Sequence, residues 1–120
     1  MTGVCSRYET GLSGTWSNRA NSAMRGFVYI MTNKPYGTLY TGVTSKLALR
    51  VDQHKRGAGS EFTRRYGLKM LVWFEIYDTI TAAIQRETSI KRWKRDWKID
   101  LINKTNPEWK DLALTEIWGL

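Results

Sequence analysis

The sequence predicts an α+β domain, a small three-stranded antiparallel sheet flanked by helices in the order β-β-α-β-α-α. Three observations lead to this prediction. Residues 28–42 have the pattern of a β-hairpin, residues 69–77 form a near-continuous apolar run, and residues 47–55 and 80–91 carry apolar side chains at helical spacing. With 120 residues, 42% of them hydrophobic, the chain has enough material for one domain with a core of ordinary size.

The hairpin opens with a short run of apolar, β-branched and aromatic residues at 28–31. Residues 33–37 follow with turn chemistry, because they contain a proline that fixes φ and a glycine that is free to adopt positive φ. The strand pattern resumes at 39–41. Such a short hairpin can bring Tyr29 and Tyr40, one from each strand, side by side. Taken alone, such a pair more often reflects simple cross-strand packing than a functional site.

The first helix is expected at Leu47–Lys55, with its N-cap among residues 44–46 and Gly57 just past its end. Arg50 and His54 are four residues apart, so they lie on the same edge of its apolar stripe. Either side chain alone could be solvated or structural. Their shared direction makes both of them candidates for a functional site.

A loop is expected over residues 57–67, where Arg64 and Arg65 are candidates for contact with a nucleic-acid backbone. The apolar run at 69–77 follows this loop. Because the run lacks polar alternation, we expect a central strand that is covered on at least one face and that pairs with the hairpin.

The second helix starts at the signals Asp78 and Thr79 and has apolar residues at a 3.6-residue spacing up to Lys91. Glu87 occupies a position that this pattern would fill with an apolar residue. A carboxylate that faces a core is costly unless it has a partner. Glu87 is therefore a candidate site residue, with an ion pair to Lys91, four residues later, as the simpler alternative.

Residues 91–98 combine two tryptophans, Trp93 and Trp97, with five cations. The cations are Lys91, Arg92, Lys94, Arg95 and Lys98. They can form a face that follows phosphates, with a tryptophan stacked on a base, or the tryptophans can be core residues beneath solvated cations. We favour core positions for both tryptophans and phosphate contact for part of the charge. A short third helix is expected at 99–103, ended by Asn106-Pro107.

The chain is strongly basic, with a formal charge of +8 and a pI near 9.8. Such an excess favours an anionic partner, either nucleic acid or a membrane surface. No apolar run approaches the ~20 residues that a spanning helix needs, and no apolar signal segment opens the chain, so nucleic acid is the favoured partner and the cytoplasm is the simplest location. Cys5 is the only cysteine, which excludes a disulfide framework or a thiolate zinc site within one chain.

The two ends of the chain are expected to lie outside the domain. Residues 1–24 are rich in Ser, Thr, Gly and Asn without a structural period, which is typical of a disordered tail. The domain itself is expected at 25–113, followed by a C-terminal tail at 114–120.

Over residues 26–106 the chain resembles the GIY-YIG nuclease family in an ordered set of residues: Tyr29, Tyr40-Thr41-Gly42, Arg50, His54 and Glu87. The similarity is greatest to its small stand-alone bacterial members, which are like the catalytic domain of the excision-repair nuclease. This resemblance implies a metal-dependent endonuclease that hydrolyses DNA phosphodiester bonds in DNA repair or recombination.

The chain also differs from the family pattern. Phe27 stands where the motif has its first glycine, with Gly26 one residue earlier, and Val43 stands where many repair-type members have a lysine. The asparagine that the family carries late in the domain corresponds to either Asn103 or Asn106, and spacing does not decide between them.

The resemblance implies a role for each residue of the set. Tyr29 is the base or proton relay and Tyr40 positions water or phosphate, although these two roles could be exchanged. Arg50 contacts phosphate through its forked guanidinium group, and His54 assists proton transfer or contacts phosphate. Glu87 holds Mg²⁺ or Mn²⁺, and the ion keeps most of its waters.

Two other functions are compatible with the same composition. A non-catalytic nucleic-acid-binding module that retains the nuclease fold would bind DNA without cutting it, and a protein-interaction domain would bind DNA only weakly. The sequence leaves the oligomeric state and the shape of the DNA substrate open.

Overall fold

The structure is a computed structural model that describes residues 24–114 and Ile117. It confirms the predicted α+β class, with an antiparallel sheet in the order β2-β1-β3. The strands are β1 (Gly26–Thr32), β2 (Leu39–Thr44) and β3 (Met70–Tyr77). The predicted N-terminal tail lies outside the described residues apart from Met24, as does most of the predicted C-terminal tail.

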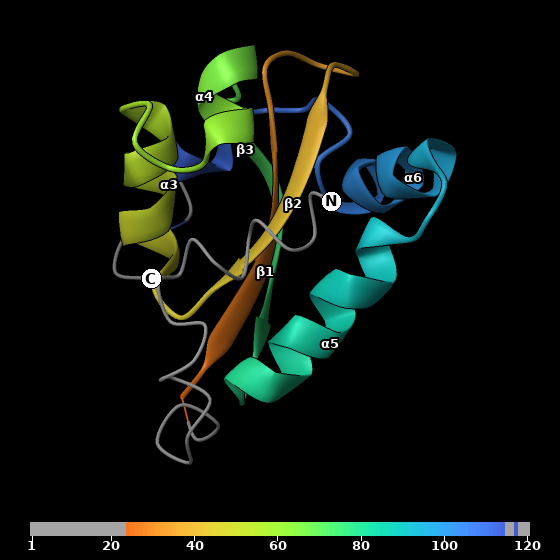
Figure 1. Ribbon diagram of the computed structural model, residues 1–120. Helices are drawn as coiled ribbons and strands as arrows, with labels where there is room; N and C mark the ends of the chain where they lie inside the picture. Colours follow the sequence, from red (N-terminus) through yellow and green to blue (C-terminus); the bar gives the residue numbers. More distant parts are fainter. Residues whose placement is uncertain (1–23, 115–116, 118–120) are drawn as a thin grey trace.

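Helices cover both faces of the sheet (Figure 1). One face carries α3 (Leu47–Lys55) and α4 (Glu61–Tyr66), and the other carries α5 (Ile80–Lys91) and α6 (Arg95–Thr105). A short 3₁₀ helix, η2 (Leu112–Leu114), packs beside β3. The core therefore consists of two apolar layers, and Ile117 joins the layer beneath α3 and α4.

The first strand is the centre of the molecule. Every residue of β1 is buried, because both of its edges are paired and both of its faces are covered. Tyr29 lies opposite Gly42 on β2 and opposite Phe74 on β3. Side chains alternate along a strand, so Tyr29 faces the α3 side, while Val28 and Ile30 face the α5 side.

The expectation that residues 69–77 form the central strand was wrong, although their pairing with the hairpin is confirmed: β3 is an edge strand. The run is apolar because helices cover both faces. Asn106 and Asp111 satisfy part of the open edge, since the Asn106 amide donates to the carbonyl of Val72 at 3.1 Å and the Asp111 carboxylate accepts from the N–H of Leu71 at 3.1 Å.

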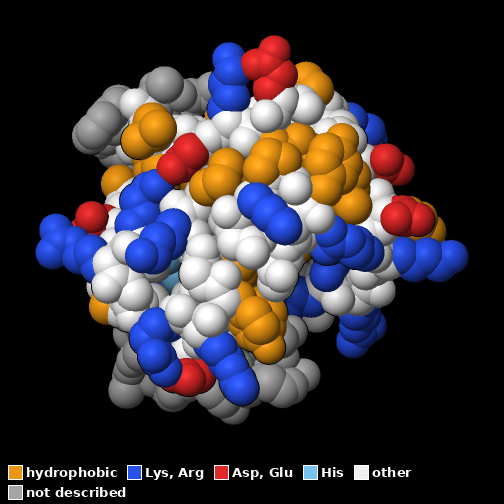
Figure 2. Space-filling model, turned by 90° about the horizontal axis from the view of Figure 1, so that it is seen from above, with side chains coloured by type: hydrophobic (Ala, Val, Ile, Leu, Met, Phe, Trp, Pro, Cys, Tyr) orange, Lys and Arg blue, Asp and Glu red, His pale blue; other side chains and the backbone are white. Residues whose placement is uncertain are grey.

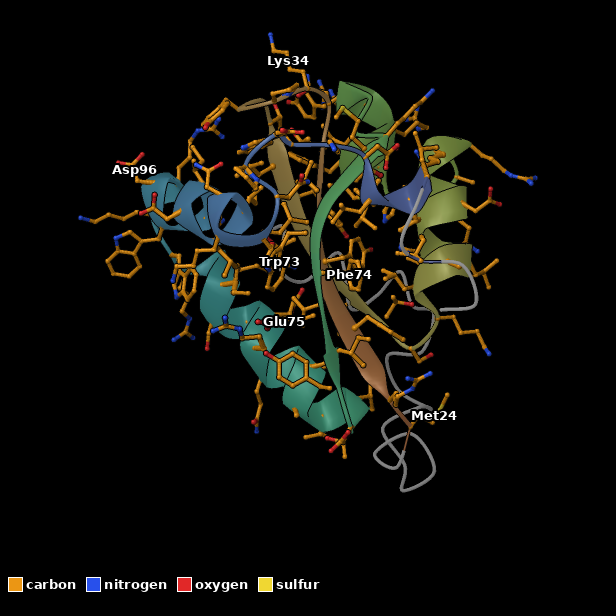
Figure 3. All side chains as sticks on the ribbon, turned by 180° about the vertical axis from the view of Figure 1, so that it is seen from behind. Met24, Lys34, Trp73, Phe74, Glu75 and Asp96 are labelled. Carbon is orange, nitrogen blue, oxygen red and sulfur yellow. The ribbon has the colours of Figure 1, made fainter. Side chains whose placement is uncertain are left out.

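An irregularity in register between β1 and β3 changes which face the β3 side chains occupy. Ile30 pairs with Trp73, but Met31 pairs with Leu71, so one residue of β3 is extra. Val72 and Trp73 consequently both pack on the α5 side. Figure 3 shows Trp73 and Phe74 pointing to opposite faces, which restores the alternation.

The predicted loop at 57–67 contains a helix, α4, that the sequence analysis missed. A capping box starts it: the Ser60 side chain accepts from the N–H of Thr63, and the Thr63 side chain accepts from the N–H of Ser60. Gly67 ends it in the left-handed conformation, with φ of 65°. Threonine replaces the usual Glu or Gln of a capping box, which is why the signal was easy to overlook.

The other helix predictions hold with small changes. Helix α3 has the predicted bounds, with Gly57 at φ of 79° just past its end, but Lys46 is its N-cap and makes no side-chain capping bond. Helix α5 also has the expected bounds, and the Thr79 side chain caps it by accepting from the N–H of Ala82. The third helix is longer than predicted, since α6 starts at Arg95.

The core placement of both tryptophans of the basic stretch was wrong in part. Trp93 is half-buried against the α5 layer, whereas Trp97 is 53% exposed. Helix α5 ends at Lys91 and α6 begins at Arg95, so the two tryptophans do not lie on one continuous helix. Their rings meet edge to face, with centroids 6.1 Å apart. Within residues 24–114, no helix combines the length and the apolar character that a membrane crossing requires.

Candidate active site

The two strands of the hairpin fit together through Tyr29 and Gly42. A Cβ atom added at Gly42 would lie 2.5 Å from the Tyr29 hydroxyl oxygen and 2.6 Å from Cζ, closer than real Cβ contacts. The ring of Tyr29 therefore crosses the place where a side chain at position 42 would start. This is the physical reason for a glycine after Tyr40-Thr41.

The Tyr29 hydroxyl is bound to His54 of α3. It lies 2.8 Å from Nε2, and the other ring nitrogen, Nδ1, lies 2.9 Å from Oγ1 of Thr63. The Thr63 hydroxyl donates to the carbonyl of Ser60 at 3.1 Å, so it accepts from His54. We therefore assign the proton of the neutral ring to Nδ1, which leaves Nε2 to accept from Tyr29.

His54 is held in its neutral form. Burial, and in second place the positive charge of Arg50, lower the pKa of His54 from its ordinary 6.5 to about 3. The ring also has little freedom, because a Cβ atom added at Gly59 would lie only 2.1 Å from Nδ1. The imidazole is thus a fixed, uncharged acceptor for the Tyr29 hydroxyl.

Tyr40 completes a cluster of three rings. Its centroid lies 6.4 Å from that of Tyr29 and 5.5 Å from that of His54. Phe62 of α4 stacks on the other side of Tyr40, with centroids 6.0 Å apart. The tyrosines that the sequence analysis paired are therefore neighbours in one buried cluster.

Glu87 and Lys91 reach this cluster from α5. Glu87 is fully buried on the helix face that also carries Ile90, and its Oε2 lies 2.5 Å from Nζ of Lys91. The same Nζ lies 6.0 Å from the centroid of the Tyr40 ring. The lysine thus connects the carboxylate to the ring cluster around the β2 edge of the sheet.

Arg50 lies next to the cluster on α3. Its side chain is buried, and Nη1 donates to Oε1 of Gln53 at 2.9 Å. Its charge acts directly on His54, as the lowered pKa of that residue indicates. The structure thus brings Tyr29, Tyr40, His54 and Arg50 together, and Lys91 links Glu87 to them.

A divalent metal would have to rely on Glu87. Among the described residues no group of three or more His, Cys, Asp or Glu could hold an ion. A single carboxylate is nevertheless compatible with Mg²⁺, which keeps several waters and completes its shell with substrate phosphate. Glu87 supplies the hard oxygen donor that such an ion prefers, in competition with Lys91.

Comparison with known proteins agrees with this geometry. The model of the GIY-YIG catalytic domain matches residues 25–100. The chain belongs to the GIY-YIG family. Membership implies nuclease activity on nucleic acid, and nucleases of this family generally depend on a divalent metal.

Relatives in the GIY-YIG family include the UPF0213 proteins of Staphylococcus aureus strains Mu3, Mu50 and N315. Each is 38% identical over 78 residues, which cover 65% of this chain and 94% of the relative. Their name states no activity. No solved structure matches the chain.

Of the other cations predicted to contact nucleic acid, two lie on α4, two lie between α5 and α6, and Arg95 begins α6. On α4, exposed Arg64 forms an ion pair with Glu61 at 2.7 Å and exposed Arg65 lies over the Tyr66 ring. Arg92 and Lys94 are exposed between α5 and α6, and Lys94 lies 5.9 Å from the Trp97 ring.

Neither candidate for the family's late asparagine is bonded to the tyrosine cluster. Asn106 is buried and closes the following loop, because its amide donates to the carbonyl of Lys110 and its oxygen accepts from the N–H of Lys110. Asn103 accepts from the indole N–H of Trp109 at 2.8 Å. These bonds therefore support structural roles for both asparagines.

Phe27 and Gly26, where the chain departs from the motif, each have a packing role. Phe27 is buried beneath α3. A Cβ atom at Gly26 would lie 2.6 Å from Cβ of Ala83, so the glycine allows α5 to approach the start of β1. The glycine is thus needed for helix packing.

The residues that hold His54 were not predicted from the sequence. Thr63, Ser60 and Gly59 all come from the segment that was expected to be a loop. The available signal was the Ser-x-x-Thr pattern at 60–63, which marks a helix start and fixes where the threonine hydroxyl points.

Proposed function

We propose that this protein is a divalent-metal-dependent endonuclease that hydrolyses DNA. The observation that supports it most is the continuous set of contacts from Thr63 through His54 and Tyr29 to Tyr40, which Lys91 extends to Glu87. These side chains come from α4, α3, both hairpin strands and α5. A purely structural core would not need an imidazole and a guanidinium group beside a pair of tyrosines, with a buried carboxylate linked to them through a lysine.

Tyr29 is the proposed proton acceptor for the attacking water. Its own proton is directed to Nε2 of His54, so the lone pairs of the phenol oxygen can accept a hydrogen bond from that water. To take the water's proton, Tyr29 must first release its own proton to solvent and react as the phenolate. A tyrosine has an ordinary pKa of ~10 and needs nearby positive charge to act as a base. Arg50 and Lys91 supply that charge in this cluster.

His54 acts on Tyr29 as a positioning residue. Both of its ring nitrogens are already used within the protein, by Tyr29 and by Thr63. Its pKa of about 3 also disfavours complete proton transfer from the phenol. Its proposed contribution is therefore to orient the hydroxyl group of Tyr29. The sequence suggested that His54 either assists proton transfer or contacts phosphate, and orienting the hydroxyl group belongs to the first of these roles.

The positive groups would stabilise the phosphate. Arg50 offers a planar fork that matches two phosphate oxygens, and Lys91 offers a point charge beside Tyr40. A divalent ion on Glu87 would supply positive charge at the phosphate where negative charge accumulates. DNA is the favoured nucleic acid because the related repair nucleases act on it, and a role in repair or recombination is part of this proposal.

A non-catalytic DNA-binding module is the competing function. The observation that favours it is the ion pair between Glu87 and Lys91, which gives the carboxylate a structural partner without any metal. In that case the cluster would stabilise the fold, and the basic surface alone would bind DNA.

A cleavage assay distinguishes the two functions. Purified protein would be incubated with plasmid, single-stranded and branched DNA in Mg²⁺, Mn²⁺ or a chelator. We expect metal-dependent cleavage that is lost in Glu87→Gln and Arg50→Lys. Glu61→Gln is the matched control, because it removes an exposed carboxylate on α4 whose partner is Arg64.

Two outcomes would contradict the proposal. Cleavage that persists in both site variants would identify a contaminating nuclease. Binding of every DNA without cleavage in any metal, together with unchanged affinity in Glu87→Gln, would establish the binding module.

A further inference from the structure

The turn between β1 and β2 carries Tyr36, which forms an aromatic pair with Trp109 from the segment after α6, and both residues have an unusual backbone conformation. Tyr36 has φ of 59° and Trp109 has φ of 54°, and they are the only non-glycine residues with positive φ in the described part of the chain. Their rings stack with centroids 4.6 Å apart and an interplanar angle of 27°. Left-handed backbone costs free energy in bulky residues, so the surrounding contacts must hold both residues in place.

The two rings differ in exposure. Trp109 is buried, whereas Tyr36 is 53% exposed. Trp109 therefore supports one face of the tyrosine ring from within the protein, and much of the tyrosine remains open to solvent. Figure 1 shows the turn at the same end of the molecule as α4, with α6 beside it.

Side chains from α6 fix the exposed ring. Asn103 links the pair, because its oxygen accepts from the Trp109 indole at 2.8 Å and its amide lies 3.3 Å from the Tyr36 hydroxyl. Arg95 donates to the backbone carbonyl of Tyr36 at 2.6 Å. Within the turn, Asn33 accepts from the N–H of Thr38 at 3.0 Å. The ring is thus an ordered surface feature, and little of its freedom would be lost on binding.

A basic hollow adjoins this turn. It has a volume of about 270 Å³ and is lined by Thr38, Leu39, Arg95 and Lys98. Neither Arg95 nor Lys98 has an ion-pair partner among the described residues, although Arg95 donates to Tyr36. Burial lowers the pKa of Lys98, and the positive charges of Lys91 and Arg95 lower it further. Lys91 and Arg95 are therefore close enough to repel Lys98, and an anion in the hollow would relieve this repulsion.

The hollow lies on the α5 side of the sheet and is linked to the proposed active site around the edge strand β2. Leu39, which lines it, precedes Tyr40 on the edge strand β2. Lys91 is close to both the active site and the hollow. Its Nζ lies 6.0 Å from the centroid of the Tyr40 ring, and its positive charge contributes to lowering the pKa of Lys98. Figure 2 views the molecule from the end that carries the turn and shows Lys and Arg side chains around exposed apolar groups on this face. A polynucleotide backbone can follow this line of charge from the site to the turn.

We propose that Tyr36, with Arg95 and Lys98, forms a subsite for an unpaired nucleotide next to the position of cleavage. The base stacks on the exposed face of Tyr36, and its phosphate lies in the hollow. Bases within a duplex are already stacked on both faces, so only a single-stranded segment can use this platform. The inference rests on the proposed nuclease function and specifies its substrate as nucleic acid with an unpaired segment beside the cut.

Equilibrium binding in a metal chelator tests the subsite separately from catalysis. Fluorescence anisotropy would compare a labelled single-stranded oligonucleotide with a blunt duplex of the same sequence, for wild type, Tyr36→Leu and Tyr36→Phe. Leucine still covers Trp109 but offers no aromatic face. Base stacking is worth about 1–3 kcal/mol, so Tyr36→Leu should weaken single-strand binding by roughly 5- to 150-fold. Duplex binding should change less than about twofold, and Tyr36→Phe should retain wild-type affinity for both.

Two further variants complete the test. Lys98→Gln should weaken single-strand binding and reduce its salt dependence by about one counterion. Tyr66→Ala is the matched control, because it removes a tyrosine of similar exposure, 47%, from α4. Thermal unfolding of every variant shows that each is folded.

The outcomes separate this inference from the nuclease proposal. Equal losses on both DNAs, or no loss in folded Tyr36→Leu, would overturn the subsite even if the protein cuts DNA. Selective loss on the single strand would establish the subsite even if wild type cuts no substrate, in which case only the nuclease proposal fails.

Discussion

The hydroxyl oxygen of Tyr29 lies 2.8 Å from Nε2 of His54, a residue 25 positions later in the chain. His54 has a pKa of about 3, so at neutral pH the hydroxyl donates to an uncharged ring. The histidine is in turn fixed by Thr63. The candidate base of the site therefore has a defined proton direction before any substrate arrives, and this arrangement can be tested on stability as well as on activity.

The first prediction concerns acid stability. In the unfolded chain His54 binds a proton near pH 6.5, whereas in the folded protein it resists protonation until about pH 3. The unfolded state thus binds more protons in this window, and the stabilisation present above pH 6.5 is lost as the pH falls toward 3. The loss should amount to about 5 kcal/mol at most, measured by urea unfolding at several pH values.

His54 is the only histidine, so a single variant provides the control. His54→Gln should be less stable than wild type at neutral pH and should show a shallower decline on acidification. Identical pH slopes in the two proteins would mean that carboxylates alone cause the decline and that His54 is not held neutral.

The second prediction concerns Thr63. Thr63→Val keeps the volume of the side chain but removes the hydroxyl that accepts from His54, which leaves a buried N–H without its partner. The free energy of unfolding should fall by about 1–3 kcal/mol, and kcat should fall by about tenfold or more as the imidazole loses its orientation. Thr63→Ser should restore most of both quantities. The exposed Thr81→Val on α5 is the control, and a Thr63→Val protein with wild-type kcat would exclude the positioning role.

The sequence predicted much of the fold because its signals are local. The turn chemistry of the hairpin, the cap at Thr79 and the glycine after α3 each mark a boundary within a few residues of it. The edge position of β3 could not be predicted in the same way. Its apolar pattern reports only that both faces are covered, while the groups that satisfy its open edge, on Asn106 and Asp111, come from 34 to 40 residues later.

The site shows the same division. Glu87 could be found because a carboxylate interrupts an apolar pattern, and Arg50 and His54 because four residues separate them on a helix. The contact of Lys91 with the Tyr40 ring could not, because it joins two elements around the edge of the sheet. The stacking of Tyr36 on Trp109 has no local signal either, since the residues are far apart in the chain.

The third prediction concerns Gly42. Gly42→Ala places a methyl group 2.5 Å from the Tyr29 hydroxyl, so the ring must move away from its bond to His54. We expect a loss of about 1–3 kcal/mol in stability together with a fall in kcat. Gly67→Ala is the control, because its positive φ imposes strain while the added methyl group meets open space. It should lose stability but keep its kcat; equal losses of kcat in the two variants would show that strain alone lowers activity.

The fourth prediction separates the structural and metal-binding roles of Glu87. Lys91→Met removes the ammonium group 2.5 Å from Oε2 and leaves a buried carboxylate without that charge. Without metal the variant should be less stable than wild type by about 3–5 kcal/mol. If Glu87 holds a divalent ion, the loss of its competitor should let Mg²⁺ or Mn²⁺ raise the Tm of Lys91→Met more than that of wild type. The double variant Glu87→Gln/Lys91→Met is the control. Its Tm, measured in the same series of Mg²⁺ and Mn²⁺ concentrations, should not rise with either ion. A Tm of Lys91→Met that is independent of both ions would assign Glu87 to the ion pair alone and remove the metal from the proposed site.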